Sequence, residues 1–218
     1  MKVVGHVYCS VEKWCGLVDG LTKEQRDKLC EIPYVKRMLE IPSIAMHEDL
    51  IKYMVESFDV QKNKFVLQSK KVEVSATGKD VQSIFGFEDE GLDVDLILDQ
   101  VGDDFAESIP ERFLSRNTEN LVIDDLVNSI VESGDTDDDF VRKVVLVLFG
   151  TVIAPQYAKI VPKNYYALVV DVKRMQKLNV NKFTLGHFIN DIIQAREGTV
   201  MKKLPKGNMA LMQVERIF

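Results

Sequence analysis

The chain has 218 residues, of which 46% are hydrophobic and 28% are charged, values that are ordinary for a globular protein. Lysine and arginine together number 28 against 34 aspartates and glutamates, so the formal net charge is −6. An acidic balance works against nonspecific binding to nucleic acid or to an anionic membrane, because both need clustered cations.

The sequence also predicts that the chain does not enter a membrane. The longest uncharged stretch, Val144–Ala158, is interrupted by Gly150 and Pro155 and is shorter than the roughly 18–20 apolar residues that cross a bilayer. The first residues lack the sustained apolar run of a signal peptide. Three cysteines, an odd number, are most simply explained as reduced thiols. We therefore expect an intracellular protein of the nucleus or cytoplasm.

The first half of the chain predicts short helices followed by a β-hairpin. Thr22 and Gln25 have the spacing of a capping box, with Leu21 placed for a hydrophobic staple. Two short helical pieces, punctuated by prolines, should follow. Ser43 is then placed to cap a helix with apolar residues at helical spacing up to Phe58.

The period changes from helix to strand after residue 60. Lys64–Gln68 and Lys71–Ser75 are short β-prone runs, joined at Ser69 and Lys70, which predict a hairpin. Thr77–Asp80 is a second capping box and opens a short helix that Gly86 ends. An isolated hairpin is marginally stable in water, so it must pack on neighbouring helices.

The second half is predicted to be helical. Residues 140–149 are apolar nearly all round and predict the central buried helix, although their β-branched side chains also suit a strand. The other predicted helices are a short one near Val94–Val101, one over 123–131 that stops at Gly134, one after Pro162, one over 185–193 that ends before Gly198, and a last one from Met209 to Phe218. The fold class is therefore mainly α, a single-domain helical bundle (residues 21–218) with a small β-hairpin packed on it and an N-terminal extension (residues 1–20).

No catalytic constellation is apparent in the sequence. There is no G-x-S-x-G elbow, no phosphate-binding glycine motif, and no motif around His6, His47 or His187. A hydrolase that pairs Cys30 with His187 remains open, because a fold can bring distant residues together. The acidic residues between 88 and 104 are better explained as a solvated face than as paired catalytic carboxylates.

Metal sites are also not supported. Asp135–Asp139 begins like a calcium loop, but Phe140 and Leu146 occupy the positions where that loop needs glycine and a bidentate acid. These acids are better explained as the cap of the helix that follows. Zinc ligation by His6, Cys9, Cys15 and Cys30 stays open, although only the first two residues have ligand-like spacing. We expect no metal and no cofactor.

Two kinds of surface are candidates for interaction. Lysines surround the hairpin (Lys62, Lys64, Lys70, Lys71) and could meet phosphate or an acidic protein, although edge lysines also keep a sheet from pairing. Three more lysines lie in a later turn (Lys202, Lys203, Lys206). Apolar residues at helical spacing near the C-terminal end of the sequence predict an exposed stripe suited to self-association (Leu211, Val214, Ile217, Phe218).

The order of these segments resembles the plant mobile domain, a transposon-associated domain of plants that also occurs beside SUMO-protease-like domains. The likeness spans about residues 21 to 218. It is carried by LTKEQRDKL, DLIKYMVESFDVQKNKFVL, VEVSATGKDVQSIFGFEDEG, DDFVRKVVLVLFGTVIAPQYAKIVPKNYYALVVDV, NKFTLGHFINDI and GNMALMQVERIF. Val180-Asn181 stands where the family often has Asn-Trp, and the only tryptophan is Trp14. The aminotransferase-like label sometimes given to such proteins finds no pyridoxal-phosphate lysine motif here.

The resemblance implies a helical interaction module of transposon origin, taken over for a host role such as silencing, with no catalytic residues to carry over. We therefore expect a non-catalytic protein-interaction module that acts as an adaptor, inhibitor or antidote. Its partner would be another protein or a second copy. The alternatives are a nucleic-acid-associated protein that uses the hairpin lysines and an unrecognised hydrolase.

Overall fold

The computed structural model of the chain describes residues 10–44, 47–67, 72–156, 159–197, 205 and 207–212. The α-helices are α1 (Val11–Asp19), α2 (Lys23–Leu29), α3 (Pro33–Met38), α4 (Glu48–Glu56), α5 (Gly78–Phe85), α6 (Val94–Leu98), α7 (Ile123–Ser133), α8 (Asp138–Leu148), α9 (Tyr166–Val169), α10 (Val172–Met175) and α11 (Val180–Glu197). The strands are β1 (Phe58–Asp59), β2 (Lys64–Leu67), β3 (Val72–Val74), β4 (Leu121–Val122) and β5 (Ile160–Val161). Short 3-10 or π turns are η1 (Asp103–Ser108), η2 (Glu111–Phe113), η3 (Phe149–Ile153), η4 (Lys163–Tyr165) and η5 (Met209–Met212). The fold is mainly α with a small antiparallel sheet, as the sequence predicts.

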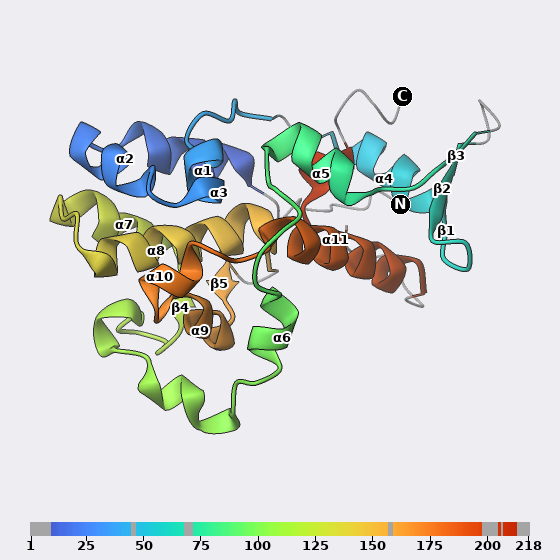
Figure 1. Ribbon diagram of the computed structural model, residues 1–218. Helices are drawn as coiled ribbons and strands as arrows, with labels where there is room; N and C mark the ends of the chain where they lie inside the picture. Colours follow the sequence, from blue (N-terminus) through green and yellow to red (C-terminus); the bar gives the residue numbers. More distant parts are fainter. Residues whose placement is uncertain are drawn as a thin grey trace.

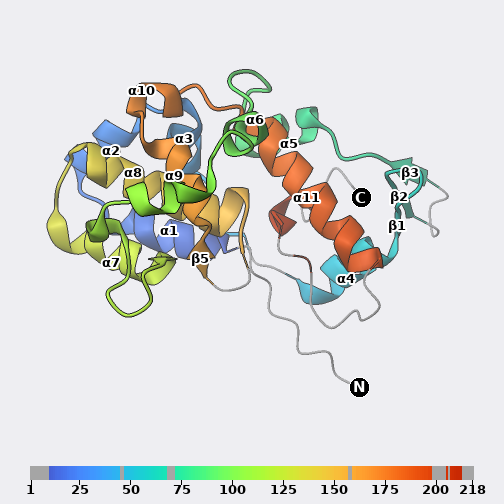
Figure 2. The same cartoon turned by 90° about the horizontal axis from the view of Figure 1, so that it is seen from below.

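The elements separate into two groups along the molecule. Figures 1 and 2 both show α1, α2, α3, α7, α8, α9 and α10 at one end, and α4, α5 and the sheet β1–β3 at the other. The long helix α11 runs between these groups. Its Phe183 ring contacts Phe149 and Tyr165, each with 5.9 Å between ring centroids, whereas Phe188 lies 6.4 Å from Phe65 of the sheet. One helix therefore packs against both ends of the molecule.

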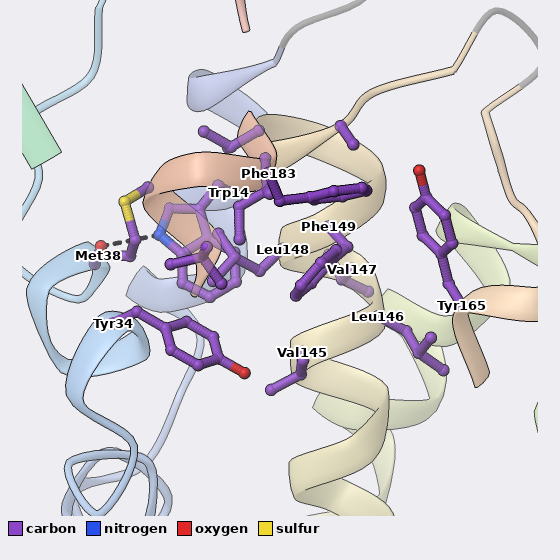
Figure 3. Close-up of a cluster of buried hydrophobic side chains, with 14 of the residues drawn as sticks. Trp14, Tyr34, Met38, Val145, Leu146, Val147, Leu148, Phe149, Tyr165 and Phe183 are labelled. Carbon is purple, nitrogen blue, oxygen red and sulfur yellow. Dashed lines mark hydrogen bonds between the residues drawn. The ribbon is translucent and has the colours of Figure 1, made fainter. Parts of the chain in front are cut away.

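The centre of the first group is α8, the buried helix predicted from residues 140–149. Asp137 precedes it and accepts a hydrogen bond from the backbone N–H of Phe140 at 2.8 Å. The side chains of Val144, Val145 and Val147 are fully buried, and Figure 3 shows part of this cluster. The capping explanation of the acidic run is thereby confirmed for Asp137.

Helix α1 lies within residues 1–20, which the sequence predicts to be an N-terminal extension, and its apolar side chains are part of the core. Trp14 is fully buried and donates its indole N–H to the backbone oxygen of Met38 at 2.8 Å (Figure 3). Val11, Leu17 and Val18 on the same helix are also buried. Burial of an indole is favourable only if its N–H finds an acceptor, and Met38 supplies one.

Both predicted capping boxes are present. The backbone N–H of Gln25 donates to Thr22 Oγ1 at 3.2 Å, and the Thr22 N–H donates back to Gln25 Oε1 at 3.0 Å. At the second box, the Thr77 N–H donates to the Asp80 carboxylate at 2.8 Å. Gly86 ends that helix with φ +68°, a left-handed conformation that glycine adopts without strain.

Several predicted helix boundaries were wrong. The helix expected to begin at Ser43 begins at Glu48, and residues 45 and 46 lie outside the described chain. The helix expected after Pro162 is divided, because Asp171 accepts hydrogen bonds from the next two backbone N–H groups and starts a new helix. Helix α11 begins earlier than expected, since the Asn179 side chain accepts from the Lys182 N–H at 2.9 Å.

Two segments far apart in the sequence meet where α11 begins. The Leu92 N–H donates to Lys177 O at 2.7 Å, and the Asn179 N–H donates to Leu92 O at 2.8 Å. Gly91 lies against this contact with φ +112°, and a Cβ atom there would be 2.3 Å from Lys177 O. The close backbone approach therefore requires glycine.

None of the helices in the described residues is long and apolar enough to span a lipid bilayer.

Candidate functional site

The sheet β1–β2–β3 is formed by the predicted hairpin and one additional short strand. All three strands are antiparallel, in that order, and Phe65 pairs with Phe58 on one side and with Val74 on the other. Phe65 and Leu67 are buried, whereas the alternate residues Lys64 and Val66 are partly exposed. The period of two thus places one face of the sheet on the helices and the other in solvent.

The outer edge of β3 is an open edge within the described residues. The sheet ends at β3, and no described strand pairs with its outer side. Figures 1 and 2 place the sheet at the end of the molecule farthest from α2 and α7. Val72 on this strand is 44% exposed. It is one of few large apolar residues in the described chain that are exposed to this extent.

The hydrogen-bond register shows which backbone groups face this edge. The Val66 N–H donates to Ser57 O at 2.7 Å, toward the β1 side. In an antiparallel strand, the backbone N–H and C=O groups of successive residues point to opposite sides. The backbone groups of Phe65 and Leu67 therefore point toward β3. They pair with Val74 and Val72. The N–H and C=O of Glu73, between these two residues, therefore point away from β2.

Two of the four hairpin lysines are in the described chain, and both contact Glu73. Lys62 Nζ lies 2.6 Å and Lys64 Nζ 3.6 Å from the Glu73 carboxylate. The hydrogen bond between Lys62 and Glu73 raises the pKa of Lys62 and lowers the pKa of Glu73. All three side chains are exposed, so the pairs contribute little to stability. Lys70 and Lys71 lie outside the described residues, as do Lys202, Lys203 and Lys206.

The expected apolar stripe near residue 218 is described only in part. Leu211 is buried in η5, a 3-10 turn that packs against α4 and α5, so the expectation that this side chain is exposed was wrong. Burial of Met209 and Ala210 in the same turn explains why: the segment fills the core between the two helices. Val214, Ile217 and Phe218 lie outside the described residues, and self-association through them stays a prediction.

His187 lies in a packed polar cluster on α11. Its Nδ1 is 3.4 Å from Asp191 Oδ2, and its Nε2 is 3.2 Å from Gln156 Nε2. The side chain of His187 is 16% exposed and that of Asp191 is 7% exposed. Cys30, the proposed hydrolase partner, is exposed at the end of α2, which Figures 1 and 2 show far from α11. The structure does not bring this cysteine and histidine together.

The acidic segment has specific contacts in addition to its exposure. Asp93 accepts hydrogen bonds from the first backbone N–H groups of α6 and pairs with Lys182, whose hydrogen bond holds the pKa of Asp93 below its usual range. Partial burial, together with the charges of Asp93 and Asp99, raises the pKa of Asp95. Asp93 therefore caps α6 and ties it to α11.

The residues with described positions do not form a metal site. Cys15 is half-buried, with its Sγ 3.5 Å from Ile41 O, and Cys30 is exposed. His6 and Cys9 lie outside the described chain. No group of three or more histidine, cysteine, aspartate or glutamate side chains in the described part could hold a metal ion.

The sequence indicates lysine side chains around the hairpin as candidate groups and does not show which edge of the sheet is open. The candidate groups are instead the backbone N–H and C=O of Glu73. The predicted hairpin nevertheless implies an open edge. Each strand of a two-stranded hairpin has one outer edge, and that edge stays unpaired unless another strand covers it. In the described chain β1, a strand too short to be predicted, covers the outer side of β2, whereas the outer side of β3 has no partner strand.

Comparison with known proteins gives a family and corrects the resemblance described above. No curated protein and no solved structure matches the chain. The model of a family described as a domain of unknown function, DUF8566, matches residues 7–213, and this match overturns the assignment to the plant mobile domain. The matched span also includes α1, which the resemblance left out. The chain belongs to the DUF8566 family.

Proposed function

We propose that the chain is a non-catalytic protein-interaction module that binds an extended segment of a partner protein at the outer edge of β3. The observation that carries this proposal is the orientation of Glu73, whose backbone donor and acceptor point away from β2. An extended peptide that adds a strand at this edge would gain main-chain hydrogen bonds.

The chemistry of β3 indicates what the partner segment should contain. Val72 and Val74 lie on the face of β3 that points toward the helices, and Val72 is 44% exposed. Side chains directly across an antiparallel pair contact one another. The bound segment should therefore carry apolar residues at alternate positions, opposite Val72 and Val74. Because β3 has only three residues, we expect a weak, transient complex.

The two alternatives receive less support. Lys62 and Lys64 already contact the Glu73 carboxylate, so their charge is partly compensated before any nucleic acid binds. His187 contacts Asp191 and Gln156 rather than a cysteine. Neither arrangement favours its alternative over strand addition.

Replacement of Glu73 by proline tests the proposal directly. Proline removes one backbone N–H, and at Glu73 that donor points to the open edge, so the pairing of β2 with β3 should survive. Glu73→Ala is the matched control, since it removes the same carboxylate and keeps the N–H. Binding peptides would first be selected on the wild-type chain from a displayed random library. They should bind Glu73→Ala at least one-third as tightly as wild type, and should bind Glu73→Pro at least tenfold more weakly than wild type.

Circular dichroism and thermal unfolding of both variants establish that they fold. Selected peptides that bind Glu73→Pro as tightly as Glu73→Ala would contradict strand addition at this edge. So would a library that yields no extended binders with alternating apolar residues.

A further inference from the structure

A polar hollow of about 800 Å³ lies between α7, the middle of α8, and residues 111–117, which comprise η2 and the segment after it. Figures 1 and 2 show α7 at the end of the molecule opposite the sheet, so this hollow is separate from the β3 edge. Three cations line it: Arg112, Arg116 and Lys143. Hydroxyl and amide side chains supply much of the remaining lining (Ser115, Asn117, Asn128, Ser129, Ser133).

Lys143 is the unusual cation of this hollow. Its side chain is half-buried, and its ammonium group donates to the Ser129 hydroxyl at 2.6 Å. The same ammonium lies 5.7 Å from the centre of the Phe113 ring, which is buried. Among the described residues, no carboxylate lies within 4.0 Å of Lys143 Nζ. A partly desolvated cation whose hydrogen-bond partner is neutral attracts an anion more strongly than a solvated one.

The two arginines that line the hollow differ in whether a carboxylate compensates their charge. Arg112 lies over the same Phe113 ring at 5.5 Å and pairs with Asp139, whose hydrogen bond raises the pKa of Arg112. Asp139 also pairs with Arg142, at 2.7 Å. Arg116 is exposed, and no described carboxylate forms an ion pair with it. The hollow therefore contains two cations, Lys143 and Arg116, without a carboxylate partner in the described chain.

Three exposed carboxylates also line the hollow, and they restrict the ligand. Glu111, Asp125 and Glu132 form no ion pair with the lining cations in the part of the chain that the structure describes. They would repel a small, highly charged anion, but they accept hydrogen bonds from hydroxyl groups. A ligand that combines one anionic group with a hydroxylated body satisfies both the cations and these acceptors.

We propose that this hollow binds a small phosphorylated polyol such as a sugar phosphate. Its phosphoryl group would contact Lys143, Ser129 and Arg116, and its hydroxyl groups would face the carboxylates and amides of the rim. A phosphoryl group suits this arrangement because its three terminal oxygens accept several charge-assisted hydrogen bonds at once. The volume is within the range of about 300–1,000 Å³ that small-molecule sites occupy.

Isothermal titration calorimetry of the full chain with glucose 6-phosphate tests the proposal. The key variant is Lys143→Met, which keeps an unbranched side chain over Phe113 and removes the charge. Lys36→Met is the control, because Lys36 is an exposed lysine on α3. We expect Lys143→Met to weaken binding at least tenfold, Ser129→Ala to weaken it by a smaller factor, and Lys36→Met to leave it unchanged.

Glucose, inorganic phosphate and gluconate separate the contributions of the two parts of the ligand. Glucose should show no binding, phosphate weak binding, and gluconate weaker binding than glucose 6-phosphate. Equal affinity of wild type and Lys143→Met, no binding of the sugar phosphate at millimolar concentration, or tighter binding of gluconate would each overturn the proposal. Unfolding temperatures of the variants distinguish a lost contact from a lost fold.

Discussion

At the scale of single residues, two buried polar side chains hold distant segments together. Asn181 is fully buried, and its Nδ2 donates to Gly78 O at 2.8 Å and to Phe87 O at 2.7 Å. Tyr34 is buried as well and donates its hydroxyl to Met175 O at 3.2 Å. In each case a buried side chain donates to a backbone carbonyl of a distant segment, so the polar side chain is satisfied and the two segments are held together.

Replacement of Asn181 by leucine should destabilise the fold by about 2–4 kcal/mol, because the two hydrogen bonds of its buried amide to Gly78 O and Phe87 O are lost. Urea unfolding measures this difference. Asn190→Leu makes the same change at an exposed position of the same helix and should shift stability by no more than about 0.5 kcal/mol. Equal effects of the two substitutions would show that Asn181 does not act through its buried hydrogen bonds.

Tyr34 should make the protein lose stability in alkali. Burial raises the pKa of its hydroxyl above the ordinary value of about 10. Above that pH the unfolded chain releases this proton while the folded chain keeps it, so stability present below pH 10 falls as pH rises. The slope for one such group is about 1.4 kcal/mol per pH unit.

Urea unfolding between pH 8 and pH 11 tests this expectation. Tyr34→Phe should be less stable than wild type at pH 8 by about 1 kcal/mol, since the hydrogen bond from the Tyr34 hydroxyl to Met175 O is lost. Its stability should then fall less steeply above pH 10. Parallel curves for the two proteins would contradict the assignment of this pH dependence to Tyr34.

At the scale of elements, helix boundaries follow caps and backbone contacts more closely than apolar periodicity. Asn179 starts α11 and Asp171 starts α10, in both cases by accepting hydrogen bonds from the first backbone N–H groups. The segment around Gly91 forms no helix because it pairs with residues 177–179. These contacts fix where α6 and α11 lie relative to each other.

Gly91→Ala should therefore disrupt this contact, because the added Cβ would lie 2.3 Å from Lys177 O at a φ of +112°. We expect a loss of about 2–4 kcal/mol, which combines backbone strain and steric overlap. Gly102→Ala is the control, since Gly102 has φ −70° and nothing lies within 4 Å of its Cβ position. That change should be neutral or stabilise by up to about 1 kcal/mol. Thermal and urea unfolding of the two variants make the comparison, and similar losses would contradict the role of Gly91.

At the scale of the whole molecule, α11 joins the two groups of elements into one core. Its aromatic residues contact Phe149 near α8 and Phe65 in the sheet. Trp14, the only tryptophan, reports on the end that contains α8, whereas far-UV circular dichroism reports on all helices. Because the core is continuous, urea unfolding followed by both signals should give one coincident transition. Two separated transitions would show that the ends unfold independently.

Much of the fold could be predicted from the sequence because its signals are local. The capping boxes at Thr22 and Thr77, the left-handed Gly86 and the apolar run of α8 each depend on neighbours a few residues away. The same local signals explain why the plant mobile domain resemblance failed. Caps, turn glycines and apolar stripes recur in unrelated helical proteins, since the physics of helices requires them.

The mainly α class, the hairpin and the central buried helix follow from the amino-acid sequence alone, because residue spacing within one element specifies each of them. Packing between distant segments, by contrast, places Glu73 at the open edge, buries Leu211, and brings Lys143 and Ser129 together beside Phe113. Those outcomes depend on which segments pack together, and residues far apart in the chain carry no spacing that specifies their contact.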